Sequence, residues 1–197
     1  MNYLAHIYLS GNDKHLKLGN FIADFIKPNE LALLPHEQQL GVKLHQKIDR
    51  FTDTHPEVRK VRELFFVEFR HYSAVLVDVI FDHYLAKNWK KYHAQSLALF
   101  AQDFYQLLKT HQEDLPYSVQ QVIPHIIRGD WLTNYAKVEG LEMILKQMNN
   151  RTSNKTSLHL CISTLMKNNQ FIEQQFFLFF KELIAYCMEE ILSMKLN

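Results

Sequence analysis

The sequence predicts an all-α protein, a single-domain compact helical bundle that spans residues 1–197. Through most of the chain the apolar residues recur at spacings of three and four, which is the period of an amphipathic helix. Only five Gly and five Pro are present, too few to supply the many turns of a β architecture. A length of 197 residues lies near the upper end of one ordinary domain and suffices to bury a substantial core.

Composition and charge argue against several classes of protein. The formal net charge of +1 gives no general reason to expect nucleic-acid binding, which needs a basic surplus or a basic face. No stretch reaches the roughly 18 apolar residues of a membrane span, and the first residues lack the pattern of a signal peptide. We therefore expect a cytoplasmic protein. Its Cys161 and Cys187 have no metal-binding or disulfide spacing and are expected to lie reduced in the core.

The first two helices are expected at residues 2–10 and 14–26. In the first helix, His6 falls on the side opposite to the apolar residues. The second helix follows a Gly-Asn-Asp capping cluster and ends before a proline. Asn20 and Asp24 lie one turn apart at the edge of its apolar face, where both side chains can look into a shared cleft.

The next two helices are expected at residues 36–51 and 56–71. On the first of these, His45 and Asp49 stand one turn apart at the border of the buried row, so an imidazole and a carboxylate can reach the same point. Asp53 is expected to cap the second helix, which begins at a proline, a residue tolerated in the first helical turn. The exposed face of that helix is basic and by default is a solvated surface.

The most unusual stretch is residues 73–89, an apolar helix that carries Asp78, Asp82 and His83. On a wheel of about 100° per residue, the two acids lie roughly 40° apart inside the apolar stripe, and apolar residues cover nearly every side of the helix. Burying two carboxylates is costly unless a cation compensates for their charge. A metal ion is the first explanation, and pairing with buried arginines is the alternative.

The second half of the chain predicts scaffold helices. They are expected at residues 94–111, at 117–128, from residue 130 onward and at 169–194, because apolar residues recur there at helical spacing. A polar loop is expected at residues 149–156. The last helix is rich in Phe and is expected to belong to the core rather than to a lipid or cofactor groove.

Acids and imidazoles at apolar borders gather in the first half of the chain, which points to one site. The set consists of His6, Asp24, His45, Asp49, Asp78, Asp82 and His83. Mixed histidine and carboxylate ligands suit manganese, iron or zinc better than calcium, and manganese is the first choice. A histidine and an aspartate four residues apart also occur often by chance. The alternative role of His83 is to hydrogen-bond to a metal ligand without touching the metal.

Several motifs in a fixed order resemble the bacterial acyl carrier protein phosphodiesterase family. They are MNYLAH at residues 1–6, GNFIADF at 19–25, the HxxxDxxTD pattern at 45–53 and VDVIFDHYLAKNW at 77–89. The resemblance covers nearly the whole chain and is strongest over the first 90 residues. It implies a helical protein distantly similar to HD-type metal-dependent phosphohydrolases. It also implies an enzyme of lipid metabolism and fatty acid biosynthesis that hydrolyses the phosphodiester between 4′-phosphopantetheine and the serine of holo acyl carrier protein.

The resemblance implies manganese as the usual metal, although another divalent transition metal would also fit. We hypothesise four metal ligands: Asp24, His45, Asp49 and Asp82. Asp78 would be a further ligand or a base, and His6 or His83 would orient water or protonate the departing serine oxygen. A basic rim would hold the acidic carrier protein by electrostatic attraction, and its candidates are Lys27, Lys43, Arg50, Arg59 and Arg62.

Two other functions stay open on the sequence. One is an HD-like phosphohydrolase that acts on a nucleotide or another small phosphodiester without needing a carrier protein. The other is a non-catalytic helical binding module, in which the acids form structural ion pairs. The sequence does not set the number of metals or the oligomeric state.

Overall fold

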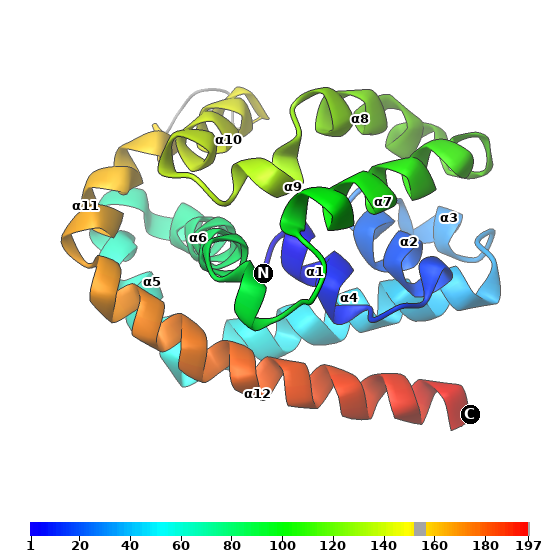
Figure 1. Cartoon of the computed structure of the whole chain (residues 1–197), viewed down its shortest axis with the longest axis horizontal. Helices are drawn as coiled ribbons and strands as arrows, with labels where there is room; N and C mark the ends of the chain where they lie inside the picture. The colour runs from blue at the N-terminus through cyan, green and yellow to red at the C-terminus, as the bar shows by residue number, and fades with distance from the viewer. Residues whose placement is uncertain (152–156, 197) are drawn as a thin grey trace.

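The computed structural model describes residues 1–151 and 157–196, and these residues form helices, turns and connections without a β-strand (Figure 1). The predicted all-α class is therefore confirmed for the described part of the chain. The α-helices are α1 Tyr3–Leu9, α2 Lys14–Ile22, α3 Pro28–Leu31, α4 His36–Thr54, α5 Pro56–Phe69, α6 Ser73–Lys87, α7 Leu97–Thr110, α8 Tyr117–Arg128, α9 Trp131–Asn134, α10 Val138–Arg151, α11 Cys161–Lys167 and α12 Asn169–Leu196.

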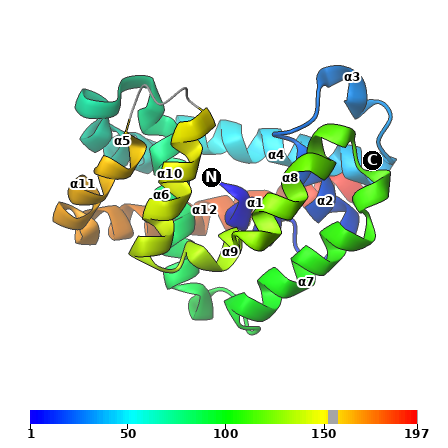
Figure 2. The same cartoon turned by 90° about the horizontal axis from the view of Figure 1, so that it is seen from above.

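Helix α6 packs against α1, α5, α10 and α12 and is covered on almost every side, as predicted (Figures 1 and 2). The long helix α12 packs along α4 and α5 on one side of it. The aromatic residues Phe176, Phe179 and Phe180 of α12 are fully buried, which confirms that this helix belongs to the core. Cys161 and Cys187 are buried and unpaired, also as predicted.

Helices α2 and α4 approach each other closely because glycines face each other where they cross. A Cβ added at Gly19 would collide with the main-chain oxygen of Gln38, and one added at Gly41 would lie 2.5 Å from the oxygen of Leu16. Only glycine permits such an approach. The crossing brings the end of α2 against the middle of α4, where the polar residues of both helices meet.

Several predicted boundaries are wrong in informative ways. Helix α2 ends at Ile22, so Asp24 lies in the turn that follows the helix. Helix α4 continues to Thr54, and His55 rather than Asp53 caps α5, because its imidazole accepts a hydrogen bond from the amide of Glu57. The helix expected from residue 130 onward is split into α9 and α10.

Helix α10 also extends to residue 151, into the segment where a polar loop was expected. The rest of that predicted loop, residues 152–156, lies outside the described residues. Within the described ranges, no helix has the length and apolar character that crossing a membrane requires.

Candidate metal centre and active site

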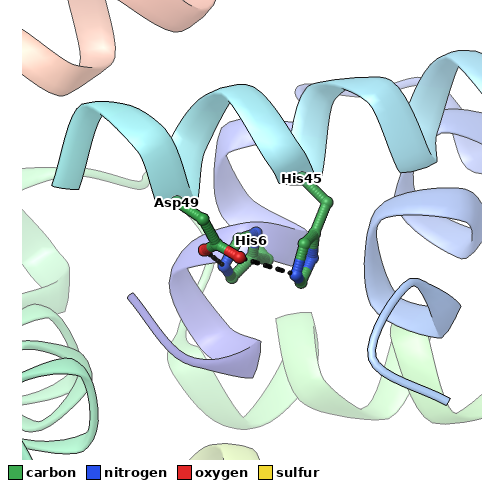
Figure 3. Close-up of side chains that lie close together, drawn as sticks. All are labelled: His6, His45 and Asp49. Carbon is green, nitrogen blue, oxygen red and sulfur yellow. Dashed lines mark ion pairs between the residues drawn. The ribbon is translucent and has the colours of Figure 1, made fainter. Parts of the chain in front are cut away.

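Two histidines and two aspartates from three segments of the chain meet at one point. His6 Nε2 on α1 lies 3.2 Å from Asp49 Oδ1 on α4, and His45 Nε2 lies 3.1 Å from the other oxygen of the same carboxylate. His45 Nε2 is also 3.2 Å from Asp24 Oδ1, in the turn after α2. Figure 3 shows both imidazoles directed at the Asp49 carboxylate. The spacing of His45 and Asp49 was thus a sound guide to a shared point.

The other nitrogen of each imidazole is held by Asn20, at the buried end of α2. The side-chain oxygen of Asn20 lies 2.7 Å from His6 Nδ1, and its main-chain oxygen lies 2.8 Å from His45 Nδ1. The two rings stack with centroids 4.0 Å apart. Both Nε2 atoms therefore face the carboxylates.

His6 is almost completely buried, although the sequence places it opposite to the apolar side of its helix. The face of α1 that carries His6 packs against α2, so both faces of the helix are covered. Sequence reasoning noticed Asn20 only as an edge residue. An amide on the apolar face of a short helix was the signal that this residue serves a buried polar partner.

The charges in the cluster depend on one another. Burial disfavours the His45 cation, but hydrogen bonds to Asp24 and Asp49 and the charges of both carboxylates outweigh it and raise the pKa of His45 to about 10. Burial and the neighbouring charge of His45 lower the pKa of His6. Burial opposes the ionisation of Asp49, but the hydrogen bond from His45 and the positive charge of that ring hold its pKa far below the usual range. The positive charge on His45 thus compensates only one of the two carboxylates, Asp24 and Asp49.

The donor set fits a divalent transition metal. Ligand atoms of His6, His45 and Asp49 lie within 4.8 Å of one another, so one cation can touch all three. Two imidazoles with one or two carboxylates are typical ligands of zinc, iron and manganese. The remaining nitrogens of both imidazoles are bound to oxygen atoms, as is usual for metal-ligating histidine. A metal here would be held by His6, His45, Asp49 and Asp24.

A cavity of about 340 Å³ opens beside the cluster. Its polar side carries His45 and four carboxylates, and its apolar side is formed by residues of α1, α6 and α10. The acidic lining consists of Asp24, Asp49, Asp53 and Asp78, and the apolar lining of Tyr3, Ala74, Val75 and Met148. The acidic and apolar residues thus line the same cavity.

Asp82 is fully buried and holds the start of α1. Its carboxylate accepts hydrogen bonds from the main-chain amides of Asn2, Leu4 and Ala5, at 3.1, 2.7 and 3.4 Å. Burial raises the pKa of Asp82 to about 7 despite these hydrogen bonds. The structure therefore places Asp82 behind the helix that carries His6, and not in the cluster of ligand atoms.

Asp78 lies one turn before Asp82 and lines the cavity. Its Oδ1 is 2.8 Å from the α-ammonium group of Met1, a partner that sequence reasoning missed. Burial raises the pKa of Asp78 to about 6, although the ammonium group opposes this shift. Among the described residues neither acid of α6 pairs with an arginine; their partners are the α-ammonium group of Met1 and the main-chain amides at the start of α1.

His83 lies outside the cavity. Its Nδ1 is 2.7 Å from the main-chain oxygen of Tyr135, and the imidazole is buried. Burial lowers the pKa of His83. The hydrogen bond ties α6 to the chain just after α9, which is a structural contribution. The predicted catalytic role of His83 gains no support from this position.

The residues of the predicted basic rim lie in different places. None of Lys27, Lys43, Arg50, Arg59 and Arg62 lines the cavity. Lys43 and Arg50 project from the side of α4 opposite to the cluster, since they stand about 160° and 140° from His45 around the helix. Arg62 donates a hydrogen bond of 3.3 Å to Ser73 Oγ, directly before the cavity-lining start of α6. Of these residues, Arg62 thus contacts a helix that lines the cavity, whereas Lys43 and Arg50 lie on the side of α4 that faces away from it.

The fold and the cluster define a helical protein with a histidine and aspartate centre of the kind that metal-dependent hydrolases use. Comparison with known proteins narrows this class. Residues 1–183 match the model of a family described as acyl carrier protein phosphodiesterase, and the chain belongs to this family.

Proteins named acyl carrier protein phosphodiesterase are similar to the chain over most of its length. The protein from Photorhabdus laumondii is 31% identical over 194 residues, which cover 96% of this chain and 94% of the relative. The protein from Pectobacterium atrosepticum is 32% identical over 152 residues, 77% of this chain and 79% of the relative. No solved structure matches. The predicted family and enzyme class, a phosphodiesterase, are confirmed, whereas the likeness to the HD-type fold stays a prediction.

Proposed function

We propose that the chain hydrolyses the phosphodiester between 4′-phosphopantetheine and the serine of holo acyl carrier protein, with a divalent metal, manganese in the first place, bound by His6, His45, Asp49 and Asp24. The observation that carries the proposal is the convergence of two imidazole Nε2 atoms on one carboxylate at the edge of a cavity. Family membership supports the substrate, since the relatives are named for this reaction.

The acidity of the cavity is the argument for a metal. A phosphodiester carries a negative charge, and the lining of the cavity presents four carboxylates to it, against only two positive groups, the imidazole of His45 and the α-ammonium group of Met1. Such a site repels its substrate unless a cation compensates. A bound divalent metal supplies that charge, polarises a phosphate oxygen and lowers the pKa of bound water. In this proposal His6 is a ligand rather than a general acid, because its Nε2 is directed into the cluster.

Asp78 is the residue best placed to move a proton. It lines the cavity, and its pKa of about 6 lets the carboxyl group exist in both protonation states near neutral pH. A carboxyl group of this kind can give a proton to the departing serine oxygen or take one from the attacking water. The ammonium group of Met1 holds the carboxyl group in place from the side.

The carrier protein would approach over α5 and the start of α6. Arg59 is exposed on α5, and Arg62 is bound to Ser73 at the start of α6, whose next two residues, Ala74 and Val75, line the cavity. Cations in this position attract an acidic partner toward the cavity mouth. The apolar wall behind them offers contacts for the pantetheine arm. Lys43 and Arg50 point away and have no part in this approach.

The direct test is incubation of the purified protein with holo acyl carrier protein and Mn²⁺, followed by the mass of the carrier. The expected result is loss of the prosthetic arm with Mn²⁺ and none in chelator. Retention of the arm, with cleavage of a small aryl phosphodiester instead, would point to an enzyme that acts on small diesters. Absence of both activities and of stoichiometric metal would favour the non-catalytic module.

A further inference from the structure

We infer that Asn20 is a positioning residue that sets the tautomer of both histidines in the cluster, with its side chain acting on one ring and its main chain on the other. The residue is fully buried and touches both rings on the side away from the carboxylates. The use of His6 and His45 as ligands rests on the proposed function. The tautomers themselves follow from hydrogen-bond geometry alone.

The orientation of the Asn20 amide is fixed by its own neighbours. One end of the amide lies 3.0 Å from the main-chain oxygen of His6 and 2.9 Å from Ser10 Oγ. A carbonyl oxygen only accepts hydrogen bonds, so this end must be the NH₂ group. Ser10 Oγ donates to the same carbonyl, at 2.8 Å, and is therefore free to accept from the amide. The opposite end is then the oxygen.

The amide oxygen decides the tautomer of His6. It lies 2.7 Å from His6 Nδ1 and can only accept, so Nδ1 must carry the hydrogen. In the neutral ring Nε2 then keeps its lone pair, which faces Asp49 and the main-chain oxygen of Met1, at 3.2 Å each. A lone pair facing two oxygen atoms is unfavourable without a cation between them. The geometry thus prepares Nε2 of His6 for a metal.

The same reasoning applies to His45 with a different part of Asn20. The main-chain oxygen of Asn20 accepts from His45 Nδ1, at 2.8 Å, so the lone pair of the neutral ring is again at Nε2, beside Asp24 and Asp49. No substitution of the Asn20 side chain removes this oxygen. A variant at position 20 should therefore change His6 and leave His45 as it is, which gives an internal control.

Nitrogen spectra of the histidine side chains test this inference on the full-length protein. We expect the metal-free wild type to show His6 in the Nδ1–H form when the ring is neutral. We expect the zinc-loaded protein to show Nδ1–H for both His6 and His45. Zinc serves as a diamagnetic probe of the same donors. An Nε2–H signal for neutral His6 in the wild type would overturn the inference without any variant.

Variants at positions 20 and 10 distinguish control of the His6 tautomer from general stabilisation of the fold. Asn20→Ala should release the His6 tautomer, keep the His45 signal and weaken Mn²⁺ binding by about 10- to 100-fold. Asn20→Asp keeps an acceptor toward Nδ1, with its second oxygen protonated toward the His6 carbonyl, and should restore the His6 Nδ1–H signal. Ser10→Ala is the matched control, because the His6 carbonyl still orients the amide, and it should leave both signals and metal affinity unchanged.

The contrary outcomes are distinct from failure of the proposed function. An Asn20→Ala protein that keeps the His6 signal and full Mn²⁺ affinity would refute the positioning role. Loss of the His6 and His45 signals together would indicate general loosening and also refute it. If Asn20→Ala does not fold, the wild-type spectra and Asn20→Asp decide. A wild type with the expected tautomers that does not cleave the carrier would refute only the proposed function.

Discussion

Two pairs of ionisable residues, each pair one helical turn apart, behave differently in this molecule. On α4, His45 and Asp49 point to one side and meet His6 and Asp24 at the edge of a cavity. On α6, the carboxylates one turn apart are occupied by the chain's own first residues. Asp82 binds three main-chain amides of α1, and its neighbour Asp78 binds the α-ammonium group of Met1.

The difference shows that burial and the type of partner distinguish a candidate metal ligand from an acid that stabilises the fold. Asp49 is about half exposed, at 44% of its side chain, and its partners are imidazoles that can exchange a proton for a metal. Asp82 is completely buried, and its partners are amides that have no other acceptor if the carboxylate turns away. Removing Asp49 should therefore affect chemistry, whereas removing Asp82 should affect folding.

The largest expected effect is loss of activity on substitution in the α4 pair. Asp49→Ala removes the carboxylate that both histidines face, so kcat/KM for release of the arm should fall by at least about 100-fold, more than loss of a supporting residue costs. Metal content should fall with it. Glu37→Ala, an exposed acid in the first turn of the same helix, is the control and should keep both activity and metal. Full activity of Asp49→Ala would refute the site.

The next effect is the pH dependence of metal binding. His45 has a pKa of about 10 without metal, so it holds a proton that Mn²⁺ must displace. Below that pKa, affinity should rise about tenfold for each pH unit, because one proton is released. Calorimetry in buffers of different ionisation enthalpy measures the proton count. His6, with its lowered pKa, and Asp49 should add none near pH 8.

As pH rises, the stability of the metal-free protein should change in the opposite direction to its metal affinity. A histidine whose pKa is raised on folding stabilises the folded state below its unfolded pKa of 6.5, and this contribution is lost as pH rises toward about 10. Metal-free protein should therefore lose stability over this range, while metal affinity increases. A flat metal affinity between pH 6 and 8 would show that His45 is not protonated in the metal-free cluster.

Substitution in the α6 pair should have a smaller effect, and on stability instead. Asp82→Asn presents an NH₂ group to amides that donate, which should lower the free energy of unfolding by about 1–3 kcal/mol. Mn²⁺ affinity of the folded variant should stay within a few-fold of the wild type. Denaturant unfolding and metal titration of the same sample measure both quantities. Loss of the metal without loss of stability would return Asp82 to the ligands, as the sequence first suggested.

The helices and the HxxxD pair could be predicted from the sequence because both are local patterns. The period of the apolar residues placed α4, α6 and α12 within a few residues, and four-residue spacing placed His45 beside Asp49. The partners of Asp78 and Asp82 could not be found in this way. They lie about 80 residues away, and they are main-chain amides and an α-ammonium group, which carry no residue-type signal.

The smallest expected effects concern the approach of the carrier protein, and they compare the two sets of basic residues. Arg59 and Arg62 lie on α5, and Arg62 reaches Ser73 at the start of α6, whose next residues line the cavity. The variants Arg59→Ala and Arg62→Ala should each raise KM by up to about fivefold at low salt, the range of exposed charge pairs. The kcat should stay constant, and the effect should fade as salt screens the charges.

Lys43→Ala and Arg50→Ala, on the opposite side of α4, are the matched controls for that comparison and should leave KM unchanged. Arg62→Ala also removes the hydrogen bond to Ser73, so its thermal stability has to be measured beside KM to separate docking from a shift of α6. An equal rise of KM for all four variants would indicate that the carrier responds to total charge. A rise confined to the α4 controls would place the carrier on the other side of the molecule, because only that side presents Lys43 and Arg50.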